Sequence, residues 1–394
     1  MILPMSSYKE DIKEAKERWN AWWDHELIDR PILSYWAPLP MQKLTAEEVQ
    51  NFFDFWGLAK NWDAIDQCID NFINTSKRVD YGGEFIPRFF PNYGPGIMAS
   101  VLGVEPVYKE KSNTVWFSRP TSIDAIVPLL ESAELNKNNP WYERLTRITE
   151  ITAKRAGKEF CITMTDLGGV LDILSSFLGP EELILNMRRR PDIIDTCREI
   201  ILEKLLKMYD DLQAIIDYHG DGCMNWMPLW SSKRWYPIQC DFSAMLNPKW
   251  FQRFVLPDII AQAEHLDYAV YHLDGPLALK FLDDLLEVPS ITGIEWVPGN
   301  NPGIEPSSHD RWMPVYKKVQ AAGKSVVINF FKNPQALTHF YTALDPKKLW
   351  IMLFSIDSIR MQYYLPRFIG GQGGEGNYRQ FRLKVKKEWK SQKS

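Results

Sequence analysis

The sequence predicts an α/β protein, a (β/α)8 barrel (TIM barrel) preceded by an N-terminal helical extension. Short apolar runs alternate along the chain with segments of helical period, and this alternation is typical of a parallel sheet covered by helices. The 394 residues suffice for one such barrel, which needs about 250 residues and up to more than 400 with insertions. A doubly wound open sheet is the alternative, but no Gly-x-Gly-x-x-Gly motif follows the first predicted strand.

The chain divides into three expected parts. Residues 1–30 form the helical extension, because apolar and aromatic side chains recur at helical spacing within residues 8–27. Residues 31–368 form the barrel. Residues 369–394 contain a Gly-rich linker and a basic tail, which would contact an acidic partner or membrane surface or remain a disordered, solubilising end.

Seven barrel strands are predicted from short apolar runs bounded by turn residues. They are residues 32–36, 160–164, 223–227, 269–273, 291–296, 326–331 and 349–354. An eighth strand is expected between residues 81 and 117, where the pattern is weak. Helices are predicted at residues 191–216, 248–263, 277–286, 310–322 and 334–343.

Composition excludes several classes of protein. Lys+Arg 46 against Asp+Glu 50 gives a net charge of -4, so a nucleic-acid partner is not expected. Five cysteines without a Cys-x-x-Cys pair argue against a disulfide framework and for a reducing cytoplasm. No signal peptide and no apolar run of about 18 residues occurs. We expect a cytoplasmic protein without a membrane partner, and without NAD or ATP because the nucleotide-binding glycine motifs are absent.

Candidate site residues follow from the strand ends, because barrel enzymes gather their working residues at the carboxyl ends of the strands. Sixteen tryptophans also favour an aromatic-walled pocket, although most of these rings are expected in the core. The predicted strand ends supply Tyr35, Trp36, Asp166, Asn225, Trp226, His272, Asp274, Glu295, Trp296 and Asn329.

Three of these residues suggest specific chemistry. His272 and Asp274 point to the same side of a strand, so they can share a metal ion or a proton, or form an inert hydrogen-bonded pair. Glu295 stands beside a tryptophan, which favours a raised pKa and a role as general acid or base, whereas a salt bridge at the strand end is the alternative.

A Gly/Pro-rich loop over residues 81–96 adds two more candidates. Its length favours function, and Arg88 could bind a substrate carboxylate through two parallel hydrogen bonds. The alternative is an ion pair between Arg88 and Glu84 that only shapes the loop. Asp166, which precedes a Gly-Gly pair, suits either catalysis or helix capping.

Three segments in the second half of the chain carry a recognisable pattern. Residues 241–248 read DFSAMLNP, a Val-Leu-Pro helix start follows at residues 255–257, and residues 270–275 read VYHLDG. These segments resemble the uroporphyrinogen decarboxylase superfamily, and Gly293-Ile294-Glu295-Trp296 is similar to its next strand. The resemblance runs from residue 30 to residue 366, more clearly after residue 220, and implies a (β/α)8 barrel.

Departures from the family pattern indicate which branch is the more similar. True uroporphyrinogen decarboxylases carry an Arg-Gln-Ala-Gly-Arg stretch after the first strand, whereas residues 37–42 here contain no arginine. The resemblance therefore favours the corrinoid-dependent methyltransferases. Thiol-methylating members bind zinc through His-x-Cys and a later cysteine, but this chain has His272-x-Asp274 and no cysteine in residues 354–357. An oxygen- and nitrogen-rich site suits a Lewis-acid metal or no metal.

These observations predict an enzyme that moves a methyl group from a small methoxyaromatic or methylamine-like donor to a corrinoid carried by a partner protein. Zinc, if a metal is bound, is expected at His272, Asp274 and Glu295, with the donor between Trp36, Trp226 and Trp296. One alternative is a metal-free decarboxylase of a different aromatic or pyrrolic carboxylate, in which Arg88 holds the substrate and Asp166 or Asp241 stabilises a protonated intermediate. Another is a non-catalytic barrel that binds a ligand or corrinoid partner. A homodimer is left open.

Overall fold

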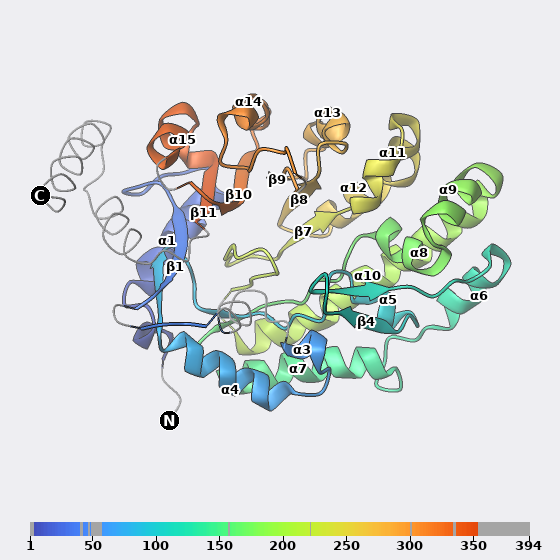
Figure 1. Ribbon diagram of the computed structural model, residues 1–394, viewed down its shortest axis with the longest axis horizontal. Coiled ribbons are helices and arrows are strands. Elements are labelled where there is room, and N and C mark those ends of the chain that lie inside the picture. The colour runs from blue at the N-terminus through green and yellow to red at the C-terminus, as the bar shows by residue number, and fades with distance from the viewer. Residues whose placement is uncertain are drawn as a thin grey trace, which may run out of the picture.

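The computed structural model describes residues 4–39, 42–45, 48, 57–156, 158–220, 222–299, 302–333 and 336–353. A seven-stranded sheet lies at the centre, with strand order β2-β1-β11-β10-β9-β8-β7 (Figure 1). Its strands are β1 (Leu33–Pro38), β2 (Val79–Gly83), β7 (Trp235–Gln239), β8 (Tyr268–Asp274), β9 (Gly293–Val297), β10 (Ser325–Phe331) and β11 (Leu349–Leu353). All neighbours are parallel except β2, which runs antiparallel to β1.

The prediction of a (β/α)8 barrel is wrong, because this sheet does not close. In the described part of the chain it ends at β2 on one side and at β7 on the other. Two short strands, β3 (Arg88–Phe89) and β6 (Cys161–Ile162), pair only with each other. The region expected to hold the eighth strand instead forms β3 and an antiparallel hairpin of β4 (Pro106–Lys109) and β5 (Thr114–Phe117).

The expected strand at residues 223–227 is also absent. The backbone there makes two isolated bridges, from Met224 to Thr163 and from Cys223 to Ser231. Gly222 precedes the segment with φ +88°, and Pro228 follows it. Because proline has no N–H and the glycine turns the chain, the apolar run cannot extend into a ladder that would join the small sheet to the large one.

Strand β7 has no counterpart among the predicted strands. Its sequence, Trp235–Gln239, contains Pro237, and a proline within an apolar run argues against a strand. The position of β7 at the end of the sheet explains the exception, since an edge strand has one side on which no ladder hydrogen bond is required.

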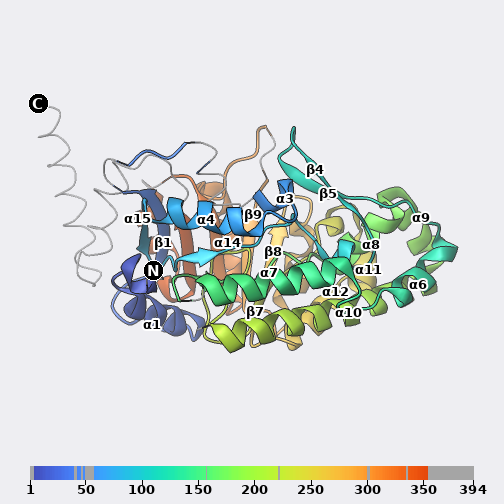
Figure 2. The same ribbon diagram turned by 90° about the horizontal axis from the view of Figure 1, so that it is seen from below.

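Helices cover the sheet and extend beyond it. Figure 1 shows α12 to α15 along the outer side of strands β7 to β11, while α7 and α10 lie side by side below (Figure 2). The α-helices are α1 (Ile12–Trp23), α3 (Gly57–Lys60), α4 (Ile65–Ser76), α5 (Met98–Val101), α6 (Ile123–Ser132), α7 (Pro140–Ala156), α8 (Val170–Leu178), α9 (Pro180–Arg189), α10 (Pro191–His219), α11 (Pro248–Phe254), α12 (Leu256–Glu264), α13 (Leu282–Leu286), α14 (Met313–Ala321) and α15 (Leu337–Ala343). Short 3-10 helices are η1 (Met5–Ser7), η2 (Asp241–Met245), η3 (Leu279–Phe281), η4 (Asp310–Trp312) and η6 (Pro346–Lys348).

The expected helix at residues 248–263 is divided into α11 and α12. Pro257 lacks the N–H that would bond to the carbonyl of Arg253, so the first helix ends before Val255 and a second one starts with the proline in its first turn. Two further helices lie where they were predicted. Residues 191–216 fall within α10, and the predicted helix at residues 310–322 corresponds to η4 and α14, which end at Ala321.

The N-terminal helix α1 is packed against the core by its tryptophans. Trp19 donates from its indole nitrogen to the carbonyl of Glu84 at 2.7 Å, and Trp23 donates to the carbonyl of Trp230 at 2.9 Å. Both indoles are buried, and Trp19 also contacts the ring of Trp350 on β11. The satisfied indole nitrogens indicate that these rings serve the core rather than a pocket.

The expected Gly-rich linker and basic tail of residues 369–394 lie outside the described part of the chain. Residues 354–357, where the family pattern was compared, lie outside it as well. Among the described residues, no helix has both the length and the apolar character needed to cross a membrane.

Candidate functional site

Three polar side chains form a row across neighbouring strands. The register pairs Gln239 of β7 with His272 of β8, and His272 with Glu295 of β9. Residues paired in this way project to the same face of a sheet, and Nδ1 of His272 lies 2.5 Å from Oε2 of Glu295. All three lie at or near the carboxyl ends of their strands, where the polar row can meet a ligand.

A group of side chains able to hold a metal ion shares His272 with this row. Asp241, at the start of η2, joins His272 and Asp274, and one ligand atom from each lies within 4.8 Å of the other two. Glu295 is not a member of this group, contrary to its expected role as a metal ligand. It holds Nδ1 of His272 instead, which leaves Nε2 for a metal in the carboxylate–histidine–metal arrangement common in proteins.

The acidic neighbours change the titration of His272. Burial acts to lower the pKa of His272, but Glu295, Asp241 and Asp274 together raise it to about 9. Burial raises the pKa of Asp274, with Asp241 and Glu295 acting in the same direction and His272 against it. A metal ion bound to His272 would therefore replace a proton that the acidic cluster otherwise retains at neutral pH.

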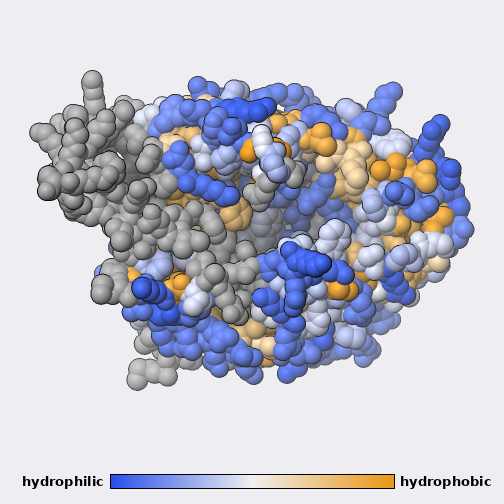
Figure 3. Space-filling view, viewed as in Figure 1, coloured by the Kyte–Doolittle hydropathy of each residue, from blue (hydrophilic) through white to orange (hydrophobic). Residues whose placement is uncertain are grey.

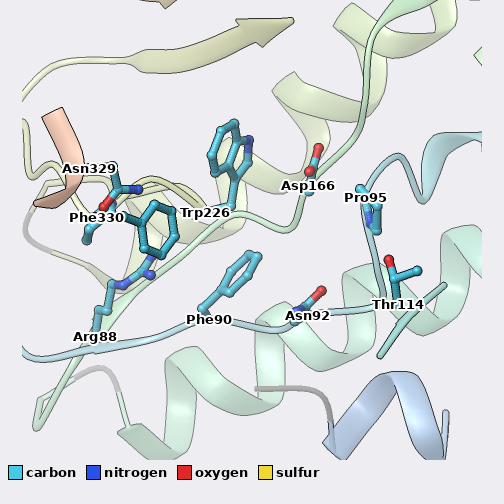
Figure 4. A pocket seen from close by; sticks show the side chains of 10 residues that line it. Arg88, Phe90, Asn92, Pro95, Thr114, Asp166, Trp226, Asn329 and Phe330 are labelled. Carbon is cyan, nitrogen blue, oxygen red and sulfur yellow. The ribbon is translucent and has the colours of Figure 1, made fainter. Parts of the chain in front are cut away.

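A cavity of about 240 Å³ lies next to the row, since its lining residue Asp166 accepts a hydrogen bond from Gln239. Figure 4 shows the side chains that line the cavity. Trp226 connects the two, because its ring lines the cavity and also meets the ring of His272 edge-on, with centroids 5.0 Å apart. Figure 3 shows a hollow near the centre of this face of the molecule. The residues that line the cavity are Arg88, Phe90, Asn92, Pro95, Thr114, Asp166, Trp226, Pro228, Asn329 and Phe330.

Asp166 is a buried acid in the cavity wall. Its Oδ1 accepts hydrogen bonds from the backbone N–H of Gly168 at 2.9 Å and from Nε2 of Gln239 at 3.0 Å. Burial raises the pKa of Asp166 to about 7, and nearby Asp241 acts in the same direction. Asp166 does not cap α8, whose N-cap is Gly169 without a side-chain hydrogen bond. An acid half-protonated at neutral pH is suited to giving or taking a proton.

The loop that carries Asp166 requires glycine at one position. Gly168 has φ +86°, and a Cβ there would lie 2.6 Å from Cα of Gly96. Two chain segments thus meet backbone to backbone, one bearing Asp166 and the other belonging to the loop that starts near Arg88. This close approach fixes one cavity wall relative to the other.

Arg88 lines the cavity without the predicted partner. Its guanidinium donates through Nη1 to the carbonyl of Asn225 and lies 5.3 Å from the ring centre of Phe90. Glu84 pairs with Arg30 instead, at 2.7 Å between Nη2 and Oε1, and is fully buried. Glu84 is thus separated from the cavity and serves the packing of β1, whose Leu33 donates its backbone N–H to the carboxylate at 2.9 Å.

Four other predicted residues lie outside the cavity lining. Tyr35 packs against Gly82 and is hydrogen-bonded to Asp80. Trp296 faces the opposite side of β9 from Glu295 and meets Trp312 with ring centroids 5.0 Å apart. The remaining two are the buried Trp36 and Asn225, whose side chain donates to the carbonyl of Trp235 at 2.8 Å. Of the three tryptophans expected around the donor, Trp226 alone lines this cavity.

Several residues of the site were not predicted. Gln239, which donates to Asp166, lies on β7, a strand that Pro237 argued against. The lining residues Phe90 and Asn92 belong to the loop already singled out for its length. Phe330 adopts φ +62° where the register of β10 shifts between Ile328 and Phe331. No sequence pattern signals a phenylalanine in the left-handed region, which residues other than glycine rarely enter.

Buried polar atoms at the site lack hydrogen-bond partners among the described residues. They are Nε1 of Trp226, Oδ1 of Asn329, Oε1 of Glu295 and Oγ1 of Thr165. Such atoms are rare in folded proteins because each costs free energy, and a bound ligand, metal or water could satisfy them.

The chain matches no known protein family model, and no curated protein matches it. Its function is therefore inferred from the geometry of the site and from the sequence resemblance.

Proposed function

We propose that the protein is a metal-dependent methyltransferase that takes a methyl group from a small methylated donor and passes it to a corrinoid carried by a separate protein. The observation that carries the proposal is the group of Asp241, His272 and Asp274, which Trp226 joins to the cavity. The same three residues stand in two of the segments that resemble the uroporphyrinogen decarboxylase superfamily. We place the reaction in the cytoplasm, since the five buried cysteines suit a reducing compartment.

The donor set fits a divalent cation such as zinc. Two carboxylates and one imidazole supply oxygen and nitrogen ligands, and the carboxylate of Glu295 orients the imidazole. A cation bound there would act as a Lewis acid that polarises the oxygen or nitrogen carrying the methyl group. The side chains around it would bind the donor and exclude water.

Asp166 would supply the proton that the reaction needs. When the methyl group leaves without its bonding electron pair, the donor oxygen or nitrogen keeps that pair and takes up a proton. Asp166 lines the same cavity and has a pKa of about 7, so it can hold a proton near neutral pH. The hydrogen bonds to its Oδ1 leave Oδ2 as the atom to carry the proton.

Metal content and methyl transfer test the proposal together. The protein is loaded with Zn²⁺ and given reduced cobalamin with a panel of methoxyaromatics and methylamines, and methylcobalamin is followed by absorbance. We expect wild type to bind one zinc and form methylcobalamin, and His272→Ala to lose both. The control is His265→Ala, since His265 also contacts a carboxylate, Asp210, but outside this group. No methylcobalamin from any donor would contradict the proposal.

A second function is favoured by the placement of Arg88 and Asp166 in one cavity. Arg88 would hold an aromatic carboxylate substrate, and the proton of Asp166 would replace the carbon dioxide that leaves the ring. Carbon dioxide release by chelator-treated protein would support this decarboxylase, whereas an unchanged rate in Arg88→Ala would contradict the role of Arg88. A ligand that raises the melting temperature without turnover in either assay would indicate a binding protein.

A further inference from the structure

The cavity holds one cationic and one acidic side chain. Among its ten lining residues these are Arg88 and Asp166. Arg88 is 7% exposed, so its charge is largely withdrawn from water. A guanidinium in a poorly solvated wall attracts an anion and repels a cation more strongly than the same group at the surface.

Below neutral pH the carboxyl group of Asp166 does not neutralise the charge of the Arg88 guanidinium. Burial raises the pKa of Asp166 to about 7, so at pH 6 most molecules carry it protonated. The cavity wall then presents the guanidinium of Arg88 and a hydrogen-bonding carboxyl group at Asp166.

The volume suits a ligand with one ring. The cavity has about 240 Å³, whereas an apolar cavity of about 150 Å³ is known to take benzene. The difference leaves space for a carboxylate and one or two small substituents on the ring. A tetrapyrrole needs a much larger site, near or beyond the upper part of the roughly 300–1,000 Å³ range of ligand pockets.

Aromatic walls favour a flat ligand. Phe90, Trp226 and Phe330 come from three separate segments of the chain and all line the cavity (Figure 4). In the same view Arg88 lies toward one end and Asp166 and Thr114 toward the other. A planar ring between the aromatic side chains would place an anionic group at Arg88 and a hydroxyl or methoxy group near Asp166.

We infer that the cavity binds a one-ring aromatic carboxylate, with the carboxylate on Arg88, and rejects ammonium donors. The inference rests on the proposed function in that it selects methoxybenzoate-like donors over methylamines as the substrates of that reaction. The binding step itself requires neither the metal nor a corrinoid protein, so it can be measured separately.

Calorimetric binding to chelator-treated wild-type protein at pH 6 tests the inference. The probes are 4-methoxybenzoate, its neutral analogue 4-methoxybenzamide and the cation phenyltrimethylammonium. We expect the carboxylate to bind at least about tenfold more tightly than the amide, as for other hydrogen bonds to a charged group, and the cation to show no binding. Equal affinity for carboxylate and amide, a preference for the cation, or no binding by any probe would overturn the inference.

Substitution of the arginine provides the second measurement. We expect Arg88→Met to lose the preference for the carboxylate over the amide and Arg88→Lys to keep part of it. The control is Arg144→Met, because Arg144 also lies over an aromatic ring, that of Trp141, but outside the cavity. An unchanged preference in folded Arg88→Met would overturn the inference, and if that variant fails to fold, the wild-type comparison still decides.

The result can be separated from that of the methyltransferase assay. Tight carboxylate binding without methylcobalamin formation would contradict the proposed function and leave the ligand class in place. Methyl transfer from methylamines alone would support the function and overturn the ligand class.

Discussion

His272 and Glu295 face each other across β8 and β9, with Nδ1 of the histidine 2.5 Å from Oε2 of the glutamate. Glu295 is fully buried, whereas His272 is partly exposed and groups with Asp241 and Asp274. A buried carboxylate on Nδ1 fixes both the orientation of the ring and the nitrogen that remains for a ligand. Glu295 is therefore a positioning residue for His272.

Replacing Glu295 by glutamine is expected to weaken zinc binding about 10- to 100-fold without abolishing it. The amide oxygen can still accept from Nδ1, but its negative charge is gone, so the imidazole becomes a weaker ligand. Competition with a chromophoric chelator measures the affinity. Glu305→Gln is the matched control, since Glu305 lies 3.7 Å from His309 in an exposed pair. Unchanged affinity would show that Glu295 does not position His272, and complete loss would make it a ligand.

The part of the site that the sequence predicts is the part set by local periodicity. His272 and Asp274 stand two residues apart on a strand, and this spacing alone places them on one face. The strands β8 to β11 are mainly apolar and were predicted for that reason. The contact of His272 with Glu295 depends on the register between two strands, which residue patterns did not supply.

The rest of the fold depends on features without a local signature. Closure of the sheet was predicted from strand–helix alternation, but alternation does not determine whether the first and last strands pair. The short strands at Arg88 and Cys161 and the broken run after Gly222 leave the sheet open. The prediction that Trp296 lines the site was wrong for a simpler reason. Successive side chains of a strand point to opposite faces of the sheet, so Glu295 and Trp296 do not both face the site, and Trp296 packs against Trp312 instead.

Replacing Asp166 by asparagine is expected to change how stability depends on pH. The folded state keeps the proton on Asp166 up to about pH 7, whereas the unfolded chain releases it near the ordinary value of 3.8. Between these values the folded state binds more protons, so wild-type stability falls as pH rises. The asparagine of the variant has no proton to lose, and its amide oxygen can still accept from Gly168 and Gln239.

Urea unfolding at pH 5 and pH 8 measures this difference. The quantity compared is the free energy of unfolding of Asp166→Asn minus that of wild type. We expect this difference to be larger at pH 8 than at pH 5 by roughly 1–3 kcal/mol. Asp124→Asn, at an exposed ion pair with Arg190, should show no such change between the two pH values. Parallel curves for Asp166→Asn and wild type would show that Asp166 titrates normally.

Removing Arg30 is expected to destabilise the fold through Glu84. The Glu84 carboxylate is fully buried, and its shortest ion pair is to Arg30 at 2.7 Å, with Arg18 at 3.5 Å. Arg30→Met leaves that charge with the weaker partner, at an expected cost of about 2–4 kcal/mol in the free energy of unfolding. Adding Glu84→Gln should restore most of this loss, because the buried charge is then gone.

Urea unfolding of the single and double variants checks the role of Arg30. Binding of 4-methoxybenzoate by the folded variants should match wild type, since neither Arg30 nor Glu84 lines the cavity. A double variant no more stable than Arg30→Met would contradict the explanation by buried charge.

Replacing Phe330 by glycine is expected to separate binding from stability. Its φ of +62° is strained for phenylalanine by about 1–2 kcal/mol, and glycine relieves this while losing partly exposed apolar surface. The free energy of unfolding should therefore change by less than about 1 kcal/mol. Affinity for 4-methoxybenzoate should fall about threefold to tenfold, because one aromatic wall is removed.

The neighbouring Phe331 is fully buried, so Phe331→Ala should cost about 3–5 kcal/mol in stability. Unchanged ligand affinity in Phe330→Gly would show that the ring does not contact the ligand.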